Sequence, residues 1–203
     1  WFKELKDLIC VEQNPIYHSE GDVWVHTMKV LDEGVKFLKK INNQYHFLLS
    51  CITHDFGKYV CTKIIDGKIK SINHEIEGIP LVKSFLNRIT YEKDLIKYVL
   101  NMTKLHMRPH TLANDKASIK ATNKMFDESV DPIALICLAN ADRNGSISID
   151  KHESNDKFLY KRLNIYYEYM SRPFVTGLDL IENGLIPNSN FSLILNYAHK
   201  LRL

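Results

Sequence analysis

The chain has 203 residues, of which 45% are hydrophobic and 25% are charged, and its formal net charge at pH 7 is +3. This balance is typical of a globular chain that can bury a core, and it excludes the concentrated basic face of a duplex-DNA-binding protein. A phosphate-bearing substrate is compatible with the small positive excess.

The four cysteines, Cys10, Cys51, Cys61 and Cys137, are scattered and form no CxxC pair. This pattern argues against a disulfide framework or a cysteine-rich zinc site, and it favours a reducing compartment. No apolar run approaches the roughly 18 residues of a membrane span, and the N-terminal residues do not follow a secretory-signal pattern. We therefore expect a cytoplasmic protein that does not associate with membranes.

The first predicted helix covers 23–41, where hydrophobic residues recur at helical spacing. Ser19 and Asp22 are candidate N-caps, because a short polar side chain there can accept a hydrogen bond from the first turn. His26 falls on the inward face of this helix. A single histidine on such a face is more often a satisfied core residue than a ligand, so its position alone does not assign it a function.

A second helix is expected over Tyr45–Asp55. Gly57 should end it, because glycine readily takes the left-handed conformation at a helix C-terminus. That places His54 and Asp55 in the last turn. Neighbouring helical residues point about 100° apart, so both can reach one ion only near a helix end or a concave wall. A buried carboxylate there needs a cation beside it.

A β-hairpin is predicted over 62–72, where the run TKIIDGKIKSI alternates hydrophobic and polar residues around an Asp-Gly turn. Helical spacing returns over 75–89 and again over 92–105. Pro109 disfavours continuation of the second of these helices. His106 should therefore lie at a helix end.

Asp131 and Pro132 mark the start of another helix, as the N-cap and the first-turn proline. Asp142 would lie at its C-terminus, where the helix dipole disfavours a carboxylate, and this misfit favours a ligand role. The remaining predicted helices cover 116–126, 132–142, 156–170, 177–182 and 190–201, with a loop over 144–155. The predicted fold class is all-α with one small hairpin and a short C-terminal helical extension.

Several histidines and aspartates fall at helix faces or ends that could converge on one place. Imidazole combined with carboxylate suits a transition metal such as Mn, Fe, Ni or Zn. The candidate ligands are His26, His54, His74, His106, His110, Asp55 and Asp142.

Four motifs in order resemble those of the HD superfamily of metal-dependent phosphohydrolases: His26 in VWVHTMKVLD, HDFGK at 54–58, HEIEG at 74–78, and Asp142 in LANADRNG. The runs YHSEGDVWVHTMKVLD and VTGLDLIENGLIPNSNFSLIL are similar to the HD domain and tail of bacterial tRNA CCA-adding nucleotidyltransferases. The resemblance implies an HD-domain helical bundle over 1–172 and a helical tail over 173–203. We recognise no nucleotidyltransferase head, so CCA polymerisation by this chain alone is not expected.

The resemblance also implies a ligand set for one or two divalent ions, with Mn, Fe, Ni, Zn and Mg as candidates. The first ion would be held by His26, His54, Asp55 and Asp142. The second would be held by His74, His106 and His110, with Asp55 as the bridge. Asp55 and Lys58 are the expected catalytic residues, and Lys58, Arg108 and Arg143 the expected contacts to phosphoryl oxygens. Lys58 and Arg143 also fit a structural explanation, since cations near a helix C-terminus are stabilised by its dipole.

The implied activity is hydrolysis of a phosphomonoester or phosphodiester, with a nucleotide or an RNA end as substrate and tRNA as a candidate partner. The alternative is an RNA-binding accessory module, or a fragment of a CCA-adding enzyme, without independent catalysis. A purely structural ion fits less well, because structural zinc favours cysteine-rich closed sites. The other histidines, His18, His46, His152 and His199, are expected to face solvent or to pair locally.

Overall fold

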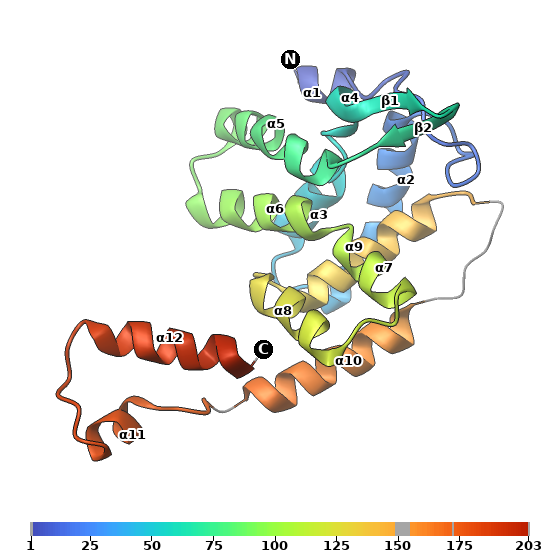
Figure 1. The fold of residues 1–203 in the computed structure, drawn as a ribbon. Coiled ribbons are helices and arrows are strands. Elements are labelled where there is room, and N and C mark those ends of the chain that lie inside the picture. Colours follow the sequence, from blue (N-terminus) through green and yellow to red (C-terminus); the bar gives the residue numbers. More distant parts are fainter. Residues whose placement is uncertain (1, 149–154, 172, 203) are drawn as a thin grey trace.

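The structure is a computed structural model that describes residues 2–148, 155–171 and 173–202. Within these residues it is helical apart from one antiparallel hairpin, which confirms the predicted fold class (Figure 1). No helix in this part of the chain is both long and apolar enough to cross a membrane. The elements are α1 Lys3–Lys6, α2 Val23–Val35, the 3₁₀ turn η1 Leu38–Lys40, α3 Gln44–Thr53, α4 Lys58–Cys61, β1 Thr62–Ile65, β2 Lys68–Ser71, α5 His74–Ile89, α6 Lys93–Leu105, α7 Arg108–Asn114, α8 Ile119–Glu128, α9 Pro132–Gly145, α10 Asp156–Met170, α11 Gly177–Glu182 and α12 Asn190–Arg202.

Helix α9 forms the centre of the hydrophobic core, because every residue from Ala134 to Ala141 is buried. Its start agrees with the sequence prediction: the Asp131 side chain accepts a hydrogen bond from the Ala134 N–H, and Pro132 lies in the first turn. Helices α2 and α3 pack against α9 and against each other. The packing of these three helices therefore fixes the positions of the side chains at their ends.

The junction after α3 is a close backbone contact and not a left-handed helix end. Gly57 has a φ of −67°, so the predicted left-handed cap is wrong. A Cβ atom at Gly57 would lie 2.0 Å from the carbonyl oxygen of His74, and one at Gly78 would lie 2.9 Å from the Gly57 nitrogen. Glycine is needed here because the end of α3 meets the first turn of α5 almost backbone to backbone. This contact brings Asp55 close to His74.

The predicted hairpin is present between α4 and α5. Strands β1 and β2 pair antiparallel, with Thr62 opposite Ser71. Asp66 and Gly67 have positive φ values of 53° and 70°, as the tight two-residue turn of a hairpin requires. The hairpin leaves the helical core at the end of α4 and returns to it at the start of α5 (Figure 1).

Helix α2 ends at Val35, so the predicted helix over 23–41 is too long. The chain continues into η1, after which Ile41 has an extended backbone and is buried. Phe37 and Leu38 pack against the core from the same turn. A 3₁₀ turn buries hydrophobic residues at nearly the same spacing as an α-helix, so the sequence pattern could not distinguish the end of α2 from η1.

Helix α6 ends at Leu105 with His106 as its C-cap, so the predicted helix end before Pro109 is confirmed. The sequence did not predict the short helix α7 that follows, where Pro109 lies in the first turn and is tolerated because first-turn N–H groups lack helical acceptors. One further predicted boundary is wrong. Helix α8 begins at Ile119 and not at 116, because Lys116 has a positive φ of 47° and Ser118 provides the N-cap.

The predicted loop over 144–155 begins later, because α9 continues to Gly145. Residues 149–154, which include His152, lie outside the described residues. Helices α10 and α11 have the predicted bounds, and α12 continues one residue beyond its predicted end at 201.

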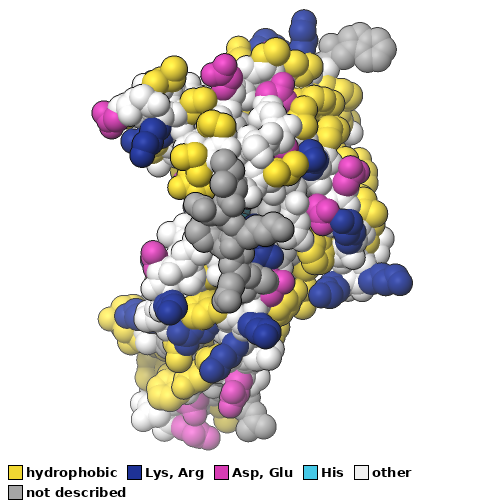
Figure 2. Space-filling view, turned by 90° about the vertical axis from the view of Figure 1, so that its right-hand side faces the viewer, with side chains coloured by type: hydrophobic (Ala, Val, Ile, Leu, Met, Phe, Trp, Pro, Cys, Tyr) yellow, Lys and Arg dark blue, Asp and Glu magenta, His cyan; other side chains and the backbone are white. Residues whose placement is uncertain are grey.

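The C-terminal helices α11 and α12 contact each other but leave much hydrophobic surface exposed. Thr176 and Asp179 form a capping box at the start of α11. The exposed fractions of Ile186 and Leu193 are 78% and 67%. His199 on α12 pairs with Asp127 of α8 at 2.8 Å. Figure 2 shows the side of the molecule that faces away from these two helices, where hydrophobic, basic and acidic side chains are mixed.

Candidate metal centre

The structure brings six of the seven predicted metal ligands together in one cluster. They come from the ends or inner faces of five helices, so the cluster depends on the tertiary fold and not on one local motif. Five of the six are buried, and Asp142 is partly exposed toward a cavity. The cluster contains His26 of α2, His54 and Asp55 at the end of α3, His74 of α5, His106 at the end of α6 and Asp142 of α9.

Four of these side chains form a first group of donor atoms. His26 Nε2 lies 3.0 Å from Asp142 Oδ1 and 3.7 Å from Asp55 Oδ2. His54 Nε2 lies 3.3 Å from Asp55 Oδ2 and 3.9 Å from Asp142 Oδ1. Nitrogen and oxygen ligands about 2.0–2.2 Å from one ion lie roughly 3–4 Å from one another, so this spacing fits a single ion.

A second group shares Asp55 with the first. His74 Nε2 lies 3.1 Å from Asp55 Oδ1, and His106 Nε2 lies 3.7 Å from the same oxygen. The two imidazole nitrogens are 3.2 Å apart. Asp55 therefore turns Oδ2 toward the first group and Oδ1 toward the second, so one carboxylate could contact an ion in each group.

The imidazole rings are oriented by the nitrogen that faces away from the cluster. His54, His74 and His106 each donate Nδ1–H to the backbone carbonyl three residues earlier, at 2.9, 2.8 and 2.7 Å respectively. These bonds fix the tautomer and leave Nε2 with a lone pair that faces the cluster. His54 Nε2 is buried and has no hydrogen-bond partner among the described residues, as expected for an atom that binds an ion.

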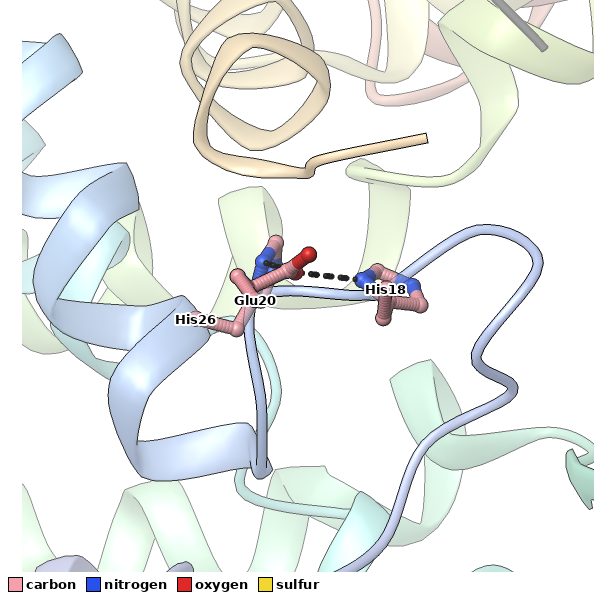
Figure 3. Close-up of side chains that lie close together, drawn as sticks. All are labelled: His18, Glu20 and His26. Carbon is pink, nitrogen blue, oxygen red and sulfur yellow. Dashed lines mark hydrogen bonds and ion pairs between the residues drawn. The ribbon is translucent and has the colours of Figure 1, made fainter. Parts of the chain in front are cut away.

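His26 is oriented differently, by the carboxylate of Glu20. Glu20 Oε1 lies 2.9 Å from His26 Nδ1 and 2.8 Å from His18 Nδ1, and its side chain is fully buried (Figure 3). Glu20 Oε2 accepts a hydrogen bond from the Ile147 N–H at 2.8 Å. Sequence reasoning assigned no role to Glu20 and expected His18 to pair locally or face solvent. The only available signal was that both residues lie in the first motif, just before Asp22.

Neighbouring charges keep the carboxylates of the cluster ionised. Burial alone would raise the pKa of Asp55, but Lys58 and His54 outweigh it and hold the pKa well below its ordinary value. Burial also raises the pKa of Asp142, but the hydrogen bond and charge of His26 lower it by more, so the pKa lies well below its ordinary value. Ionised carboxylates in a buried site attract a cation strongly.

The two histidine environments differ electrostatically. Burial lowers the pKa of His26, but its bonds to Asp142 and Glu20 overcome this and raise the pKa to about 9. Burial, together with the neighbouring His74 and His54, lowers the pKa of His106 to about 3. His106 is thus held as the neutral imidazole that a metal ion requires.

Lys58, a predicted catalytic and substrate-binding residue, lies directly beside the cluster. Its Nζ is 2.7 Å from Asp55 Oδ2 and donates a hydrogen bond to Gln13 Oε1 at 2.8 Å. We assigned no role to Gln13 from the sequence, and in the structure it is buried and lines the cavity. Lys58 therefore contacts the Asp55 carboxylate and also lines the cavity in front of it.

An open cavity of about 1030 Å³ leads to the cluster. Asp55, His74 and Asp142 lie on its inner wall, and the hairpin lysines Lys68 and Lys70 line it from the side. The volume reaches the upper end of the roughly 300–1,000 Å³ usual for small-molecule sites. A substrate much larger than inorganic phosphate can be accommodated.

The remaining predicted residues differ in their relation to the cavity. His110 lines it, but its Nε2 donates to the Ala139 carbonyl at 2.8 Å, and His110 belongs to neither group of ligands. Arg143 lines the cavity and pairs with Asp156 at 3.5 Å. Arg108 pairs with Glu128 and is not brought to the cavity wall.

No protein-family model matches the chain. The sequence is distantly similar to multifunctional CCA proteins, with 28% identity to that of Actinobacillus pleuropneumoniae serotype 5b over 112 residues, which is 55% of this chain and 27% of the relative. Identity to the protein of Acinetobacter baylyi is 30% over 54% of this chain and 25% of the relative. Identity to that of Alkalilimnicola ehrlichii is 24% over 85% and 41%. The chain thus spans from a quarter to two fifths of the length of these relatives.

Proposed function

We propose that this chain is a metal-dependent phosphohydrolase that acts on a phosphomonoester or phosphodiester in a nucleotide or an RNA end. The observation that carries the proposal is the position of Asp55. Its two oxygens face two separate groups of imidazole nitrogens at 3.1–3.7 Å. A carboxylate shared between the two groups supports a pair of divalent ions, because each ion would then have at least one negatively charged ligand.

The donors divide between the two ions. His26, His54, Asp142 and Asp55 Oδ2 would hold the first ion, and His74, His106 and Asp55 Oδ1 would hold the second. Imidazole and carboxylate donors favour Mn, Fe, Ni or Zn over Mg, which prefers oxygen ligands. When bound, such ions supply hydroxide near neutral pH and offset negative charge on phosphoryl oxygens.

The other polar groups of the cavity would bind and orient the substrate. Lys58 offers an ammonium group beside Asp55, where a phosphoryl oxygen would have to come. Arg143 adds a guanidinium at the cavity wall. For Arg108 the predicted phosphate contact finds no support, since its guanidinium is engaged with Glu128 away from the cavity wall.

A nucleotide or RNA end is the substrate class that best matches the cavity. Its volume exceeds what a single phosphate needs, and Lys68 and Lys70 extend the positive charge away from the cluster along β2. The similarity to multifunctional CCA proteins supports a substrate related to tRNA. We also propose the division into a phosphohydrolase domain over 1–172 and a helical tail over 173–203, because the tail helices bury little surface.

The second candidate is an RNA-binding accessory module, or a part of a longer CCA protein, that keeps the ion site without independent catalysis. Two observations favour it. The chain matches only a portion of its relatives, and the tail exposes hydrophobic side chains such as Ile186 and Leu193.

Metal analysis combined with a substrate screen separates the candidates. Protein stripped with a chelator would be reloaded with Mn²⁺, Ni²⁺ or Zn²⁺ and assayed with 2′,3′-cyclic nucleotides, nucleoside monophosphates and short RNAs that end in a phosphate. We expect one or two equivalents of metal, turnover only in the reloaded protein, and loss of turnover on renewed stripping. Tight binding of tRNA without turnover under any metal would favour the accessory module. A protein that contains and accepts no metal would contradict both.

A further inference from the structure

The four imidazoles of the metal centre do not have equivalent outer partners. His54, His74 and His106 donate Nδ1–H to neutral backbone carbonyls. His26 alone donates to a carboxylate, that of Glu20. The nearest comparable carboxylate in the second group is Glu75, whose oxygen lies 3.8 Å from His74 Nδ1, too far for a hydrogen bond.

Glu20 also connects the two elements that carry ligands of the first group. Its Oε2 accepts from the Ile147 N–H, just after α9, and the adjacent Ser19 N–H donates to the Ile147 carbonyl at 3.0 Å. Helix α9 carries Asp142, and α2 carries His26. Glu20 therefore fixes the spacing of α2 and the end of α9 as well as the orientation of one ring.

Glu20, His18 and His26 do not form an ion site of their own, although their donor atoms lie close together. One carboxylate oxygen faces Nδ1 of both rings, and an ionised carboxylate can only accept (Figure 3). Both Nδ1 atoms must then carry a hydrogen directed at Glu20. Without lone pairs on these nitrogens the trio cannot ligate an ion, and its role is to hold His26.

We propose that Glu20 is a positioning residue that strengthens the first ion group through His26, so that this group binds its ion more tightly than the second. The inference rests on the proposed metal centre. A carboxylate that accepts Nδ1–H raises the electron density on Nε2 and fixes the ring, and removing such an outer partner typically weakens metal binding about 10–100-fold. Among the described residues the second group has no equivalent partner, because His74 and His106 donate to backbone carbonyls, so this group should not depend on Glu20.

The test is a titration of chelator-stripped protein with Mn²⁺. Binding is monitored by calorimetry and, separately, by the electron paramagnetic resonance signal of free Mn²⁺. Wild-type protein should bind in two resolved steps. Glu20→Gln should weaken the tighter step about 10–100-fold and leave the weaker step unchanged. Glu20→Asp keeps the charge on a shorter side chain, and we expect it to fall between Glu20→Gln and wild type.

Glu92→Gln is the matched control, because Glu92 also pairs with a histidine, His46 Nε2 at 3.2 Å, outside the cluster. It should leave both steps unchanged. Circular dichroism shows whether each variant is folded. If Glu20→Gln does not fold, the inference is tested with Glu20→Asp, which should weaken the tighter step and leave the weaker step unchanged.

The outcomes separate this inference from the proposed function. If the wild-type protein binds no Mn²⁺ in either assay, the proposed metal centre itself is contradicted. A single class of sites in wild type, equal weakening of both steps, or a titration of the Glu20 variant that superimposes on wild type would each overturn the role of Glu20. The metal centre would stand in all three cases.

Discussion

The cluster around Asp55 and the C-terminal helices α11 and α12 are stabilised in opposite ways. Around Asp55, side chains from five helices are buried and fixed by contacts between residues far apart in the sequence, such as His26 with Asp142 at 3.0 Å. In the tail, the clearest stabilising contact is local, the capping box of Thr176 and Asp179. Hydrophobic residues such as Leu193 remain exposed. Substitutions should therefore have large effects in the first region and small effects in the second.

The largest effect is expected for Asp55→Asn. The amide keeps the shape of the side chain but removes the charge that both ion groups share. Because loss of an outer partner already costs about 10–100-fold, loss of this ligand should lower the hydrolysis rate by more than about 100-fold. Circular dichroism should show that the helices remain.

The matched change in the tail is His199→Ala, which removes an ion pair with Asp127 but touches no ligand. Its metal content and its rate on a minimal cyclic-nucleotide substrate should match wild type. Wild-type hydrolysis by Asp55→Asn would show that Asp55 is not part of the catalytic centre.

The same truncation in each region tests the contrast in packing. Leu138 of α9 is fully buried, so Leu138→Ala should lower the free energy of unfolding by about 3 kcal/mol through lost burial and the cavity left behind. Leu193→Ala removes an exposed side chain and should change it by less than about 0.5 kcal/mol. Urea denaturation followed by circular dichroism measures both values. Equal losses would mean that the tail is packed as tightly as the core.

A smaller effect is expected where a single methyl group is added. Gly57→Ala places a Cβ atom against the His74 carbonyl and the Gly78 nitrogen, and should destabilise the protein by about 2 kcal/mol. Gly177→Ala adds the same group where nothing lies within 4 Å, and should change stability little. Thermal melting of the two variants compares them directly. A Gly57→Ala variant as stable as Gly177→Ala would show that the α3–α5 contact is less tight than the structure has it.

The sequence was most informative where local chemistry decides the conformation. Asp131 and Pro132 predicted the start of α9, and the Asp-Gly pair predicted the hairpin turn, because each acts within a few residues. The predicted left-handed cap at Gly57 was wrong. Glycine is required there because the backbone of α5 lies too close for a side chain, and a contact between distant segments leaves no local sequence pattern.

The candidate site divides in the same way. His26, His54 and Asp142 could be proposed as ligands because they stand in recognisable motifs, and the structure brings them together. Glu20 was missed because its partners include Ile147, which lies 127 residues away and beyond the reach of helical spacing. Arg108 stood near a predicted ligand in sequence, but its nearest carboxylate is on α8.

The contact between Gly57 and His74 also separates two parts of the molecule that can change independently. It closes the chain between the end of α3 and the start of α5, so we expect the proposed ligands on both sides to keep their spacing when the segment between them changes. The hairpin of β1 and β2 extends from the chain between these two contacting segments. Loops whose ends are held close together tolerate changes in length at a small cost in folding free energy. Since residues of β2 line the cavity, we expect changes in the hairpin to alter which substrates bind while the proposed ion ligands stay fixed. A graft of hairpins of different length and charge at 62–71 would exploit this division.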